Sequence, residues 1–296
     1  MLSVEDKWKS ETLDEVFNAL ALSPELSEIL VYKGARVLRL LLNEVTRASL
    51  DIDASFAKLA ANVSVNSDDL EHLRILAQNA ITAHFESQQP VRYSLQSSTI
   101  RNRRRIGDHP RGWNVYWLDL EIRDMAAQNF LGAAPTLRIE IAATELLSEH
   151  SISPIQLNGR LVQAVTLERM AGEKLRAFIS SLPAYRNKIR EKIHIHRAKD
   201  LYDLARIRRK RPLEERVFWQ ISGQEFYLAC QSRCIDCDGI RTFKEQWDTT
   251  QQVYRSDATI PGDVPFTEAE NTLEQIVTFL EEMGPIPFAF ELPEIK

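Results

Sequence analysis

Two neighbouring stretches decide the fold: Ile29-Leu30-Val31-Tyr32-Lys33-Gly34-Ala35-Arg36-Val37-Leu38 and, shortly afterwards, Ser49-Leu50-Asp51-Ile52-Asp53. The first reads as an apolar strand that turns into a helix at Gly34, with glycine placed where backbone must approach a ligand closely. The second reads as a strand on which Asp51 and Asp53, two residues apart, project from the same face. Paired carboxylates beside a helix start predict a metal site next to a phosphate site, because the free N–H groups of the helix receive phosphate oxygens.

A strand, a glycine turn, a helix and a strand with Asp-x-Asp together resemble the layout of polymerase-β-type nucleotidyltransferases. Lys33-Gly34-Ala35 and Ser49-Leu50-Asp51-Ile52-Asp53 are similar to the KGGTxL and RFSxDIDL motifs of the AbiEii/AbiGii family, nucleotidyltransferase toxins of bacterial toxin–antitoxin and phage-defence systems. A later block, Glu173 to Phe178 followed by Arg197 to Leu204, resembles that family's EKLxAh and RxxRDhYDL motifs. With both blocks in the right order, the resemblance extends over roughly residues 10 to 210.

The resemblance implies an enzyme that uses a nucleoside triphosphate and Mg²⁺ and transfers the nucleotide to a hydroxyl group. The residues that it places at the triphosphate are Lys33, Gly34, Ala35, Ser49 and Lys174. It also implies that Asp200 is a catalytic aspartate. The acceptor in related toxins is tRNA, and the expected partner is an antitoxin encoded by a neighbouring gene.

A third carboxylate is predicted from the strand Leu137-Arg138-Ile139-Glu140-Ile141. Glu140 stands alone between two β-branched residues, and we expect it to join Asp51 and Asp53 as a metal ligand, or to act as base to the attacking hydroxyl. Asp119 and Glu121 are the alternatives, although an outward-facing polar strand edge already accounts for both.

Lys174 lies in an otherwise apolar stripe of a predicted helix. A lysine in that position either extends its ammonium group to solvent or faces a buried anion. The resemblance, which places this lysine at a phosphate, favours the anion. On a helix starting near Arg197, Asp200 and Asp203 are three residues apart, and Asp203 is predicted to cap the helix or to pair with Arg197 or Arg206.

The predicted fold class is α+β. We expect a nucleotidyltransferase domain with a mixed sheet flanked by helices over residues 1–160, and a helical domain completing the nucleotide cleft over residues 161–296. Ser67 is the expected N-cap of a long helix. Residues 248–265 read as a polar loop, and Thr267 with Glu270 forms a capping-box pattern at the start of the last helix.

The composition is that of a soluble globular protein of 296 residues, with a net charge of −5. Since no apolar run approaches the ~20 residues that cross a bilayer and the N-terminus does not resemble a signal peptide, we expect a cytoplasmic protein with no membrane partner. The basic clusters at residues 101–105 and 206–211 are candidates for RNA phosphate contacts, or are simply a solvated turn and a basic helix end. Cys230, Cys234 and Cys237 are read as reduced thiols, with zinc binding through a distant fourth ligand as the alternative.

The sequence departs from the family at Ala35 and Arg36, which replace a glycine and a threonine. A nucleotide- or RNA-binding protein with weakened or lost transfer is therefore a second possible function. Nucleotide transfer to a protein side chain is a third, because it uses the same donor site. A fourth is an interaction protein in which Asp51-Ile52-Asp53 is a surface strand end. The sequence keeps Asp51, Asp53, Lys174 and Asp200, charges that are costly to bury, which favours an active enzyme over a binding protein that has lost transfer. The two independent motif blocks favour the enzyme over an interaction protein.

Overall fold

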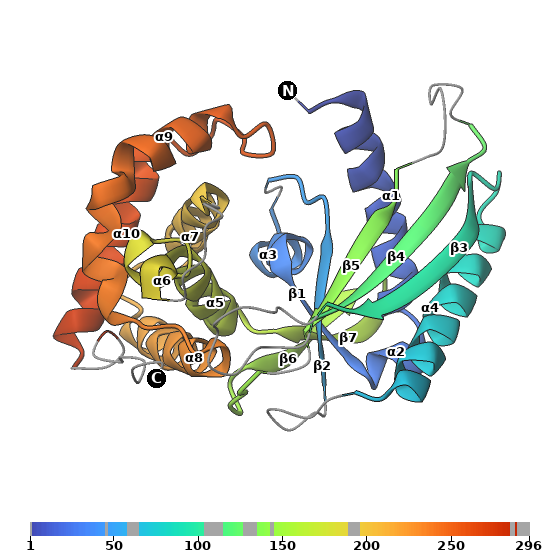
Figure 1. The fold of residues 1–296 in the computed structure, drawn as a ribbon, viewed down its shortest axis with the longest axis horizontal. Coiled ribbons are helices and arrows are strands. Elements are labelled where there is room, and N and C mark those ends of the chain that lie inside the picture. Colours follow the sequence, from blue (N-terminus) through green and yellow to red (C-terminus); the bar gives the residue numbers. More distant parts are fainter. Residues whose placement is uncertain are drawn as a thin grey trace.

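The structure is a computed structural model that describes residues 2–44, 47–57, 65–103, 115–126, 135–142, 145–188, 196–284 and 288. Figure 1 shows a twisted sheet with helices along it in one half of the molecule and a group of helices in the other. None of the helices in these ranges has the length and apolar character needed to cross a membrane.

The sheet has seven strands in the order β3-β4-β5-β2-β1-β7-β6. The strands are β1 (Leu30–Lys33), β2 (Ile52–Phe56), β3 (Tyr93–Asn102), β4 (Val115–Asp124), β5 (Leu137–Ala142), β6 (Ile152–Leu157) and β7 (Arg160–Val165). β2 runs parallel to β5 and β1 runs parallel to β7, whereas the other neighbours are antiparallel. The sheet is therefore mixed, and the predicted α+β class is confirmed.

The helices lie before, between and after these strands. They are α1 (Val4–Ala21), α2 (Pro24–Ser27), α3 (Gly34–Leu42), α4 (Ser67–Ser87), α5 (Leu167–Ile179), α6 (Pro183–Lys188), α7 (Ala198–Lys210), α8 (Arg216–Arg233), the 3₁₀ helix η1 (Asp238–Gln246), α9 (Trp247–Ser256) and α10 (Phe266–Glu282). α1, α2 and α4 lie along the sheet, and α5 to α10 form the helical half (Figure 1).

The two faces of the sheet differ in character. Along β4, Tyr116, Leu118 and Ile122 are buried in the core, whereas Glu121 and Arg123 on the opposite face are exposed. Successive strand residues point to opposite faces, so the alternation separates an apolar face from an open polar one. The open face carries the candidate site described below.

Three predictions about helices are wrong: the starts of two helices, and a third helix that was predicted as a loop. The N-cap of α4 is Asn66, whose side chain accepts a hydrogen bond from the Asp69 N–H, so the helix begins at Ser67 instead of being capped by it. α10 begins at Phe266 after Pro265, and no side chain caps it, so the expected capping box does not form. Residues 248–265 include most of α9, which has only three apolar residues, Trp247, Val253 and Tyr254, and therefore reads as a polar loop.

The hairpin of β6 and β7 was not predicted. Its two-residue turn, Asn158-Gly159, has φ values of +47° and +80°, the left-handed conformation that tight hairpins favour for these residue types. β7 pairs with β1, so the sheet continues to Val165, beyond residue 160 where the sequence placed the end of the first domain. The division into two domains stays a prediction.

Candidate active site

A row of polar side chains crosses the open face of five strands. Lys33 on β1 is opposite Asp53 on β2, and Asp53 lies in register beside Glu140 on β5. Glu140 is opposite Trp117 on β4, and Trp117 is opposite Arg101 on β3. Residues paired in this way point to the same face of a sheet. The cross-strand row thus brings the predicted carboxylates Asp53 and Glu140 onto adjacent strands.

Asp51 precedes β2, in a bend, so its predicted position on the strand is wrong. Its orientation comes from Ser49, whose hydroxyl is 2.9 Å from Asp51 Oδ1 and 3.0 Å from the Asp51 carbonyl oxygen. Ser49 thus orients the first carboxylate, and its predicted contact with the triphosphate stays a prediction.

The three carboxylates lie within one another's electric field. Burial and then the charges of Asp51 and Glu140 raise the pKa of Asp53 to about 7. Burial and then Asp51 also raise the pKa of Glu140. Burial opposes ionisation of Asp51 as well, but Lys199, the Ser49 hydroxyl and Arg47 outweigh it and lower its pKa. Mutual repulsion of this kind is relieved by a hard divalent cation, which prefers oxygen ligands.

These three carboxylates do not form a complete metal site on their own. In the part of the chain that the structure describes, no three Asp, Glu, His or Cys side chains gather closely enough to hold an ion. Mg²⁺ commonly takes one or two protein carboxylates and completes its shell with substrate phosphate oxygens and water. Asp53 together with Asp51 or Glu140 would fit that kind of site.

Gly34 joins β1 to α3 with a left-handed φ of +79°. A Cβ atom at this position would overlap Asp53 Oδ2 and lie 3.1 Å from Asp53 Cγ. The helix start therefore rests directly against the Asp53 carboxylate. No side chain caps α3 at Lys33 and no acidic residue lies in its first turn, so the N–H groups of the helix start are not taken up by a carboxylate of that turn.

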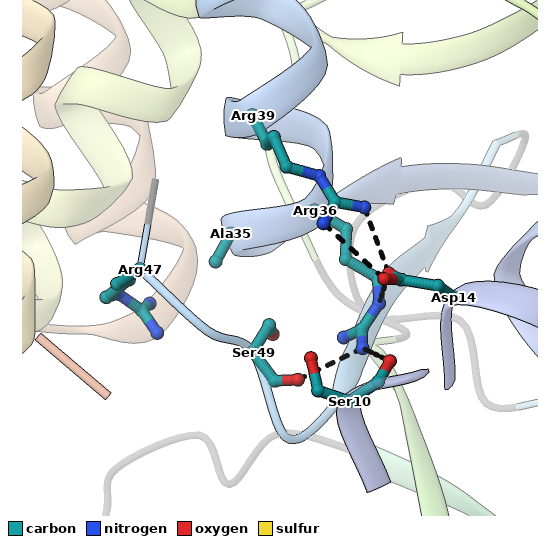
Figure 2. A pocket seen from close by; sticks show the side chains of 7 residues that line it. All are labelled: Ser10, Asp14, Ala35, Arg36, Arg39, Arg47 and Ser49. Carbon is teal, nitrogen blue, oxygen red and sulfur yellow. Dashed lines mark hydrogen bonds and ion pairs between the residues drawn. The ribbon is translucent and has the colours of Figure 1, made fainter. Parts of the chain in front are cut away.

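Arg36 explains one departure from the family motif. Its buried guanidinium donates to the Ser10 and Ser49 carbonyls at 3.0 Å each and also to the Asp51 carbonyl. It donates to Asp14 Oδ1 at 3.0 Å as well. Figure 2 shows Arg36 reaching between Asp14, Ser10 and Ser49 beside a pocket of about 10 Å³. Arg36 therefore ties α3 to α1 and to the segment that carries Asp51.

Lys33 is engaged by carboxylates. Its Nζ lies 2.5 Å from Glu145 Oε1 and 3.8 Å from Glu173 Oε2, and its side chain is buried. Glu145 also accepts hydrogen bonds from Ser55 and Arg233. The sequence did not reveal Glu145, since it is 112 positions from Lys33 and belongs to no motif. Any phosphate contact by Lys33 would have to compete with this buried pair.

Lys174 faces buried anions, so the alternative in which it reaches solvent is wrong. Its Nζ is 3.1 Å from Asp200 Oδ1 and 2.6 Å from Asp203 Oδ2, and both aspartates are fully buried. Burial lowers the pKa of Lys174, but Asp203 and Asp200 outweigh it and raise the pKa overall. Burial opposes ionisation of Asp200, yet Arg197 and Lys174 lower its pKa.

Asp203 has a different partner from the predicted ones. Arg47 donates to both of its carboxylate oxygens, at 3.0 and 3.1 Å. Arg197 instead pairs with Asp200 at 2.6 Å. The prediction that Asp203 caps the helix or pairs with Arg197 or Arg206 is therefore wrong, because a loop residue distant in sequence fills this position.

The buried cluster of Lys174, Asp200, Asp203 and Arg47 faces the cross-strand row. Lys174 is one of the charges that lower the pKa of Asp53, and Asp53 helps to raise the pKa of Arg197. The structure thus brings Lys174 and Asp200, from α5 and α7, to the side of the site opposite the sheet.

The alternative carboxylates and two arginines of the second basic cluster form hydrogen bonds or ion pairs with neighbouring side chains. Asp119 accepts from Arg101 and Arg138 at 2.7 Å each, and the exposed Glu121 accepts from Ser97 at 2.7 Å. In the second basic cluster, Arg206 pairs with Glu44 and Asp263, and Arg209 with Glu268. The ion pairs account for these two arginines without an RNA ligand.

Comparison with known proteins supplies a family. The sequence profile of the family described as "Nucleotidyl transferase AbiEii toxin, Type IV TA system" matches residues 18–275. A crystal structure of an antigenic nucleotidyltransferase-like protein from Paracoccidioides brasiliensis is 13% identical, with a TM-score of 0.35, and covers 73% of this chain and 89% of its own. The solution structure of the antibiotic-resistance factor ANT(2″)-Ia is 11% identical, with a TM-score of 0.28, and covers 84% of this chain and 96% of its own. No curated protein sequence matches the chain.

Proposed function

This chain belongs to the AbiEii nucleotidyltransferase toxin family of type IV toxin–antitoxin systems, and we propose that it transfers a nucleotide from a nucleoside triphosphate to an RNA hydroxyl. The motif resemblance is thereby confirmed as family membership. The observation that carries the proposal is the position of Asp53, in register beside Glu140 and directly against the helix start at Gly34. A carboxylate pair next to a helix start that no side chain caps suits the phosphates and metal ion of a triphosphate.

The donor would bind between the helix start and the buried cluster. The first N–H groups of α3, at Gly34 and Ala35, donate to the β- and γ-phosphates. Lys174, poised between Asp200 and Asp203, adds positive charge on the opposite side. Ser49 holds Asp51 in place, and Asp51 and Asp53 would hold Mg²⁺, with Glu140 as a third ligand or as the base. When bound, Mg²⁺ would neutralise phosphate charge and stabilise the entering and leaving oxygens.

Glu140 is the proposed base. Its raised pKa suits a carboxylate that accepts a proton from the acceptor hydroxyl. The hydroxyl oxygen forms a bond to the α-phosphorus, the bond from that phosphorus to the bridging oxygen breaks, and pyrophosphate leaves. The proton passes to Glu140, so charge and atoms balance.

The proposed acceptor is tRNA, the proposed cognate partner is an antitoxin encoded beside this gene, and the proposed role is growth arrest in toxin–antitoxin or phage defence. Transfer to a protein side chain is the second candidate, because the donor site is the same. The replacement of threonine by Arg36 is compatible with activity, since Arg36 supports the segment that holds Asp51.

The test is to incubate the purified protein with total tRNA, Mg²⁺ and each of four α-labelled triphosphates. We expect label to enter tRNA, and the Asp53→Asn variant, folded by circular dichroism, to transfer none. If the label enters protein instead, the acceptor is a protein side chain and not RNA. Triphosphate binding without any transfer would contradict the proposed transferase activity.

A further inference from the structure

Beyond Glu140, the cross-strand row ends in an aromatic ring surrounded by arginines. The guanidinium carbons of Arg138, Arg103 and Arg101 lie 3.6, 4.2 and 5.5 Å from the centroid of the Trp117 ring. These four residues, here called the arginine platform, are Arg138 on β5, Trp117 on β4, Arg101 on β3 and Arg103 directly after β3. Three guanidinium groups over one ring make a surface that is both cationic and suited to stacking.

The platform is held in place but open. Asp119 accepts hydrogen bonds from Arg101 and Arg138, at 2.7 Å each, and thereby fixes their guanidinium planes near the ring. The side chains of Arg101 and Arg138 remain 57% and 36% exposed. Since one carboxylate is shared by two arginines and Arg103 adds a third positive charge, the platform keeps a net positive charge.

Its position in the row relates it to the chemistry. Lys33 and Gly34 lie on one side of Asp53, at the start of α3, where the proposed function puts the leaving pyrophosphate. Trp117 lies on the other side, directly beyond Glu140. In phosphoryl displacement the attacking and leaving oxygens are roughly in line, so the acceptor approaches from the side opposite the leaving group. That side is the arginine platform.

We propose that the arginine platform binds a single-stranded segment of the RNA acceptor, with its bases stacked on the guanidinium planes that Trp117 supports and its phosphates paired with the arginines. Single strands are held by basic surfaces with stacking aromatic side chains, and arginine planes serve as stacking partners as well. A net positive surface favours a polyanion over a protein segment as its ligand. The proposal rests on the proposed function, which makes Glu140 the base.

Binding is measured apart from transfer, by fluorescence anisotropy of a 5′-labelled single-stranded RNA oligonucleotide with the full-length chain. Loss of one stacked base costs about 1–3 kcal/mol, so Trp117→Ala, which removes the ring that supports the guanidinium planes, should weaken RNA binding roughly tenfold, and Trp117→Phe less. Arg103→Gln should lower the slope of log affinity against log salt by about 0.7, the value for one phosphate contact to a single strand. Triphosphate affinity should not change in any of the three.

The matched control is Arg160→Ala. Arg160 is also an exposed strand arginine, but it lies on β7 towards the other edge of the sheet, where it donates to the Leu22 carbonyl. We expect this variant to bind RNA as the wild type does. Arg103→Gln keeps the test valid if Trp117→Ala fails to fold, because Arg103 is exposed and its backbone hydrogen bond to Val115 does not involve the side chain.

The outcomes separate this proposal from the proposed function. If Trp117→Ala and Arg103→Gln bind RNA as tightly as the wild type while the wild type labels RNA, RNA does not bind at the arginine platform, but the proposed transferase activity is supported. If the variants lose RNA binding but the wild type transfers no nucleotide, the platform stands and the transferase fails. A wild type that binds no RNA and labels protein would overturn the platform.

Discussion

At Gly34 the end of β1, the start of α3 and the Asp53 carboxylate meet. Two features require glycine at this position. The backbone has a φ of +79°, and a Cβ atom would overlap the Asp53 carboxylate. The requirement was visible in the sequence as a glycine between an apolar strand and a helix. Its contact with Asp53 was not, because that contact depends on how β1 pairs with β2.

Gly34→Ala should abolish transfer and lower the free energy of unfolding by more than about 2 kcal/mol. Gly159→Ala is the matched control, since Gly159 has a φ of +80° but nothing within 4 Å of an added Cβ. It should lose about 1–2 kcal/mol of stability through backbone strain alone and keep full activity. Urea unfolding and the transfer assay measure both quantities. Equal activity in the two variants would contradict the close approach to Asp53.

Asp53 makes stability depend on pH in the metal-free protein. Its pKa is about 7 in the folded state, above the value near 4 of an unfolded aspartate, so folding favours its protonated form. The associated stability is fully present below pH ~4 and is lost as the pH rises towards 7. Asp53→Asn removes this dependence. The stability of the variant relative to the wild type should rise by on the order of 2 kcal/mol between pH 5 and pH 7.

Denaturant unfolding in the presence of a chelator, at pH 5, 6, 7 and 8, measures this difference. The comparison with Asp53→Asn matters because other carboxylates, such as Glu145, have lowered pKa values and change stability in the opposite direction. A difference between variant and wild type that does not change with pH would contradict the raised pKa of Asp53.

Among elements, α3 shows how a substitution that departs from a motif can be accommodated. Arg36 fills the space between α1 and the segment before β2, and its hydrogen bonds to three backbone carbonyls explain why an arginine is buried there. A motif comparison alone suggests a weakened phosphate site. The carbonyls that Arg36 meets belong to residues 10, 49 and 51, and sequence reasoning has no means of bringing them together.

Arg36→Gln should destabilise the protein by about 3 kcal/mol, because it leaves buried carbonyls and Asp14 with fewer donors. Arg39→Gln is the matched control. Arg39 contacts the same Asp14 at 3.0 Å, but its side chain is 43% exposed, so its loss should cost less than about 1 kcal/mol. Thermal melts of both variants test this. Similar losses would show that Arg36 is only a surface ion pair.

The elements that sequence reasoning missed share a weak pattern. α9 has only three apolar residues, Trp247, Val253 and Tyr254, so its composition resembles that of a polar loop. β6 is largely exposed along its length, and the Asn158-Gly159 turn was the one sequence signal for the hairpin. Strongly patterned elements such as β1, β5 and α5 were predicted close to their observed positions, since burial on one or both faces leaves a clear signal.

At the scale of the whole molecule, buried ion pairs join the two halves across the site. Arg47, in the segment before β2, holds Asp203 on α7, and Lys33 on β1 holds Glu145 and Glu173. Family motifs predicted that Lys174 and Asp200 belong to the site, but not that they pair with each other. Such pairs join residues many positions apart, and sequence spacing does not encode them.

Lys174→Met should therefore affect both stability and the site. Asp200 keeps Arg197 and Asp203 keeps Arg47, so the loss in unfolding free energy should be about 3 kcal/mol, near the lower end for breaking a buried pair. Triphosphate with Mg²⁺ should raise the melting temperature of the wild type more than that of the variant, because binding to the folded state alone is stabilising. An equal ligand-induced rise in both would remove Lys174 from the donor site.

The most direct test of the central claim compares two labels in one assay. Purified protein, tRNA and Mg²⁺ are incubated with the same triphosphate labelled either at the α- or at the γ-phosphorus, using wild type and Asp53→Asn. We expect that α-label enters the acceptor, that γ-label is released in pyrophosphate, and that Asp53→Asn does neither. Transfer of γ-label to the acceptor, or undiminished α-transfer by Asp53→Asn, would contradict the proposed function.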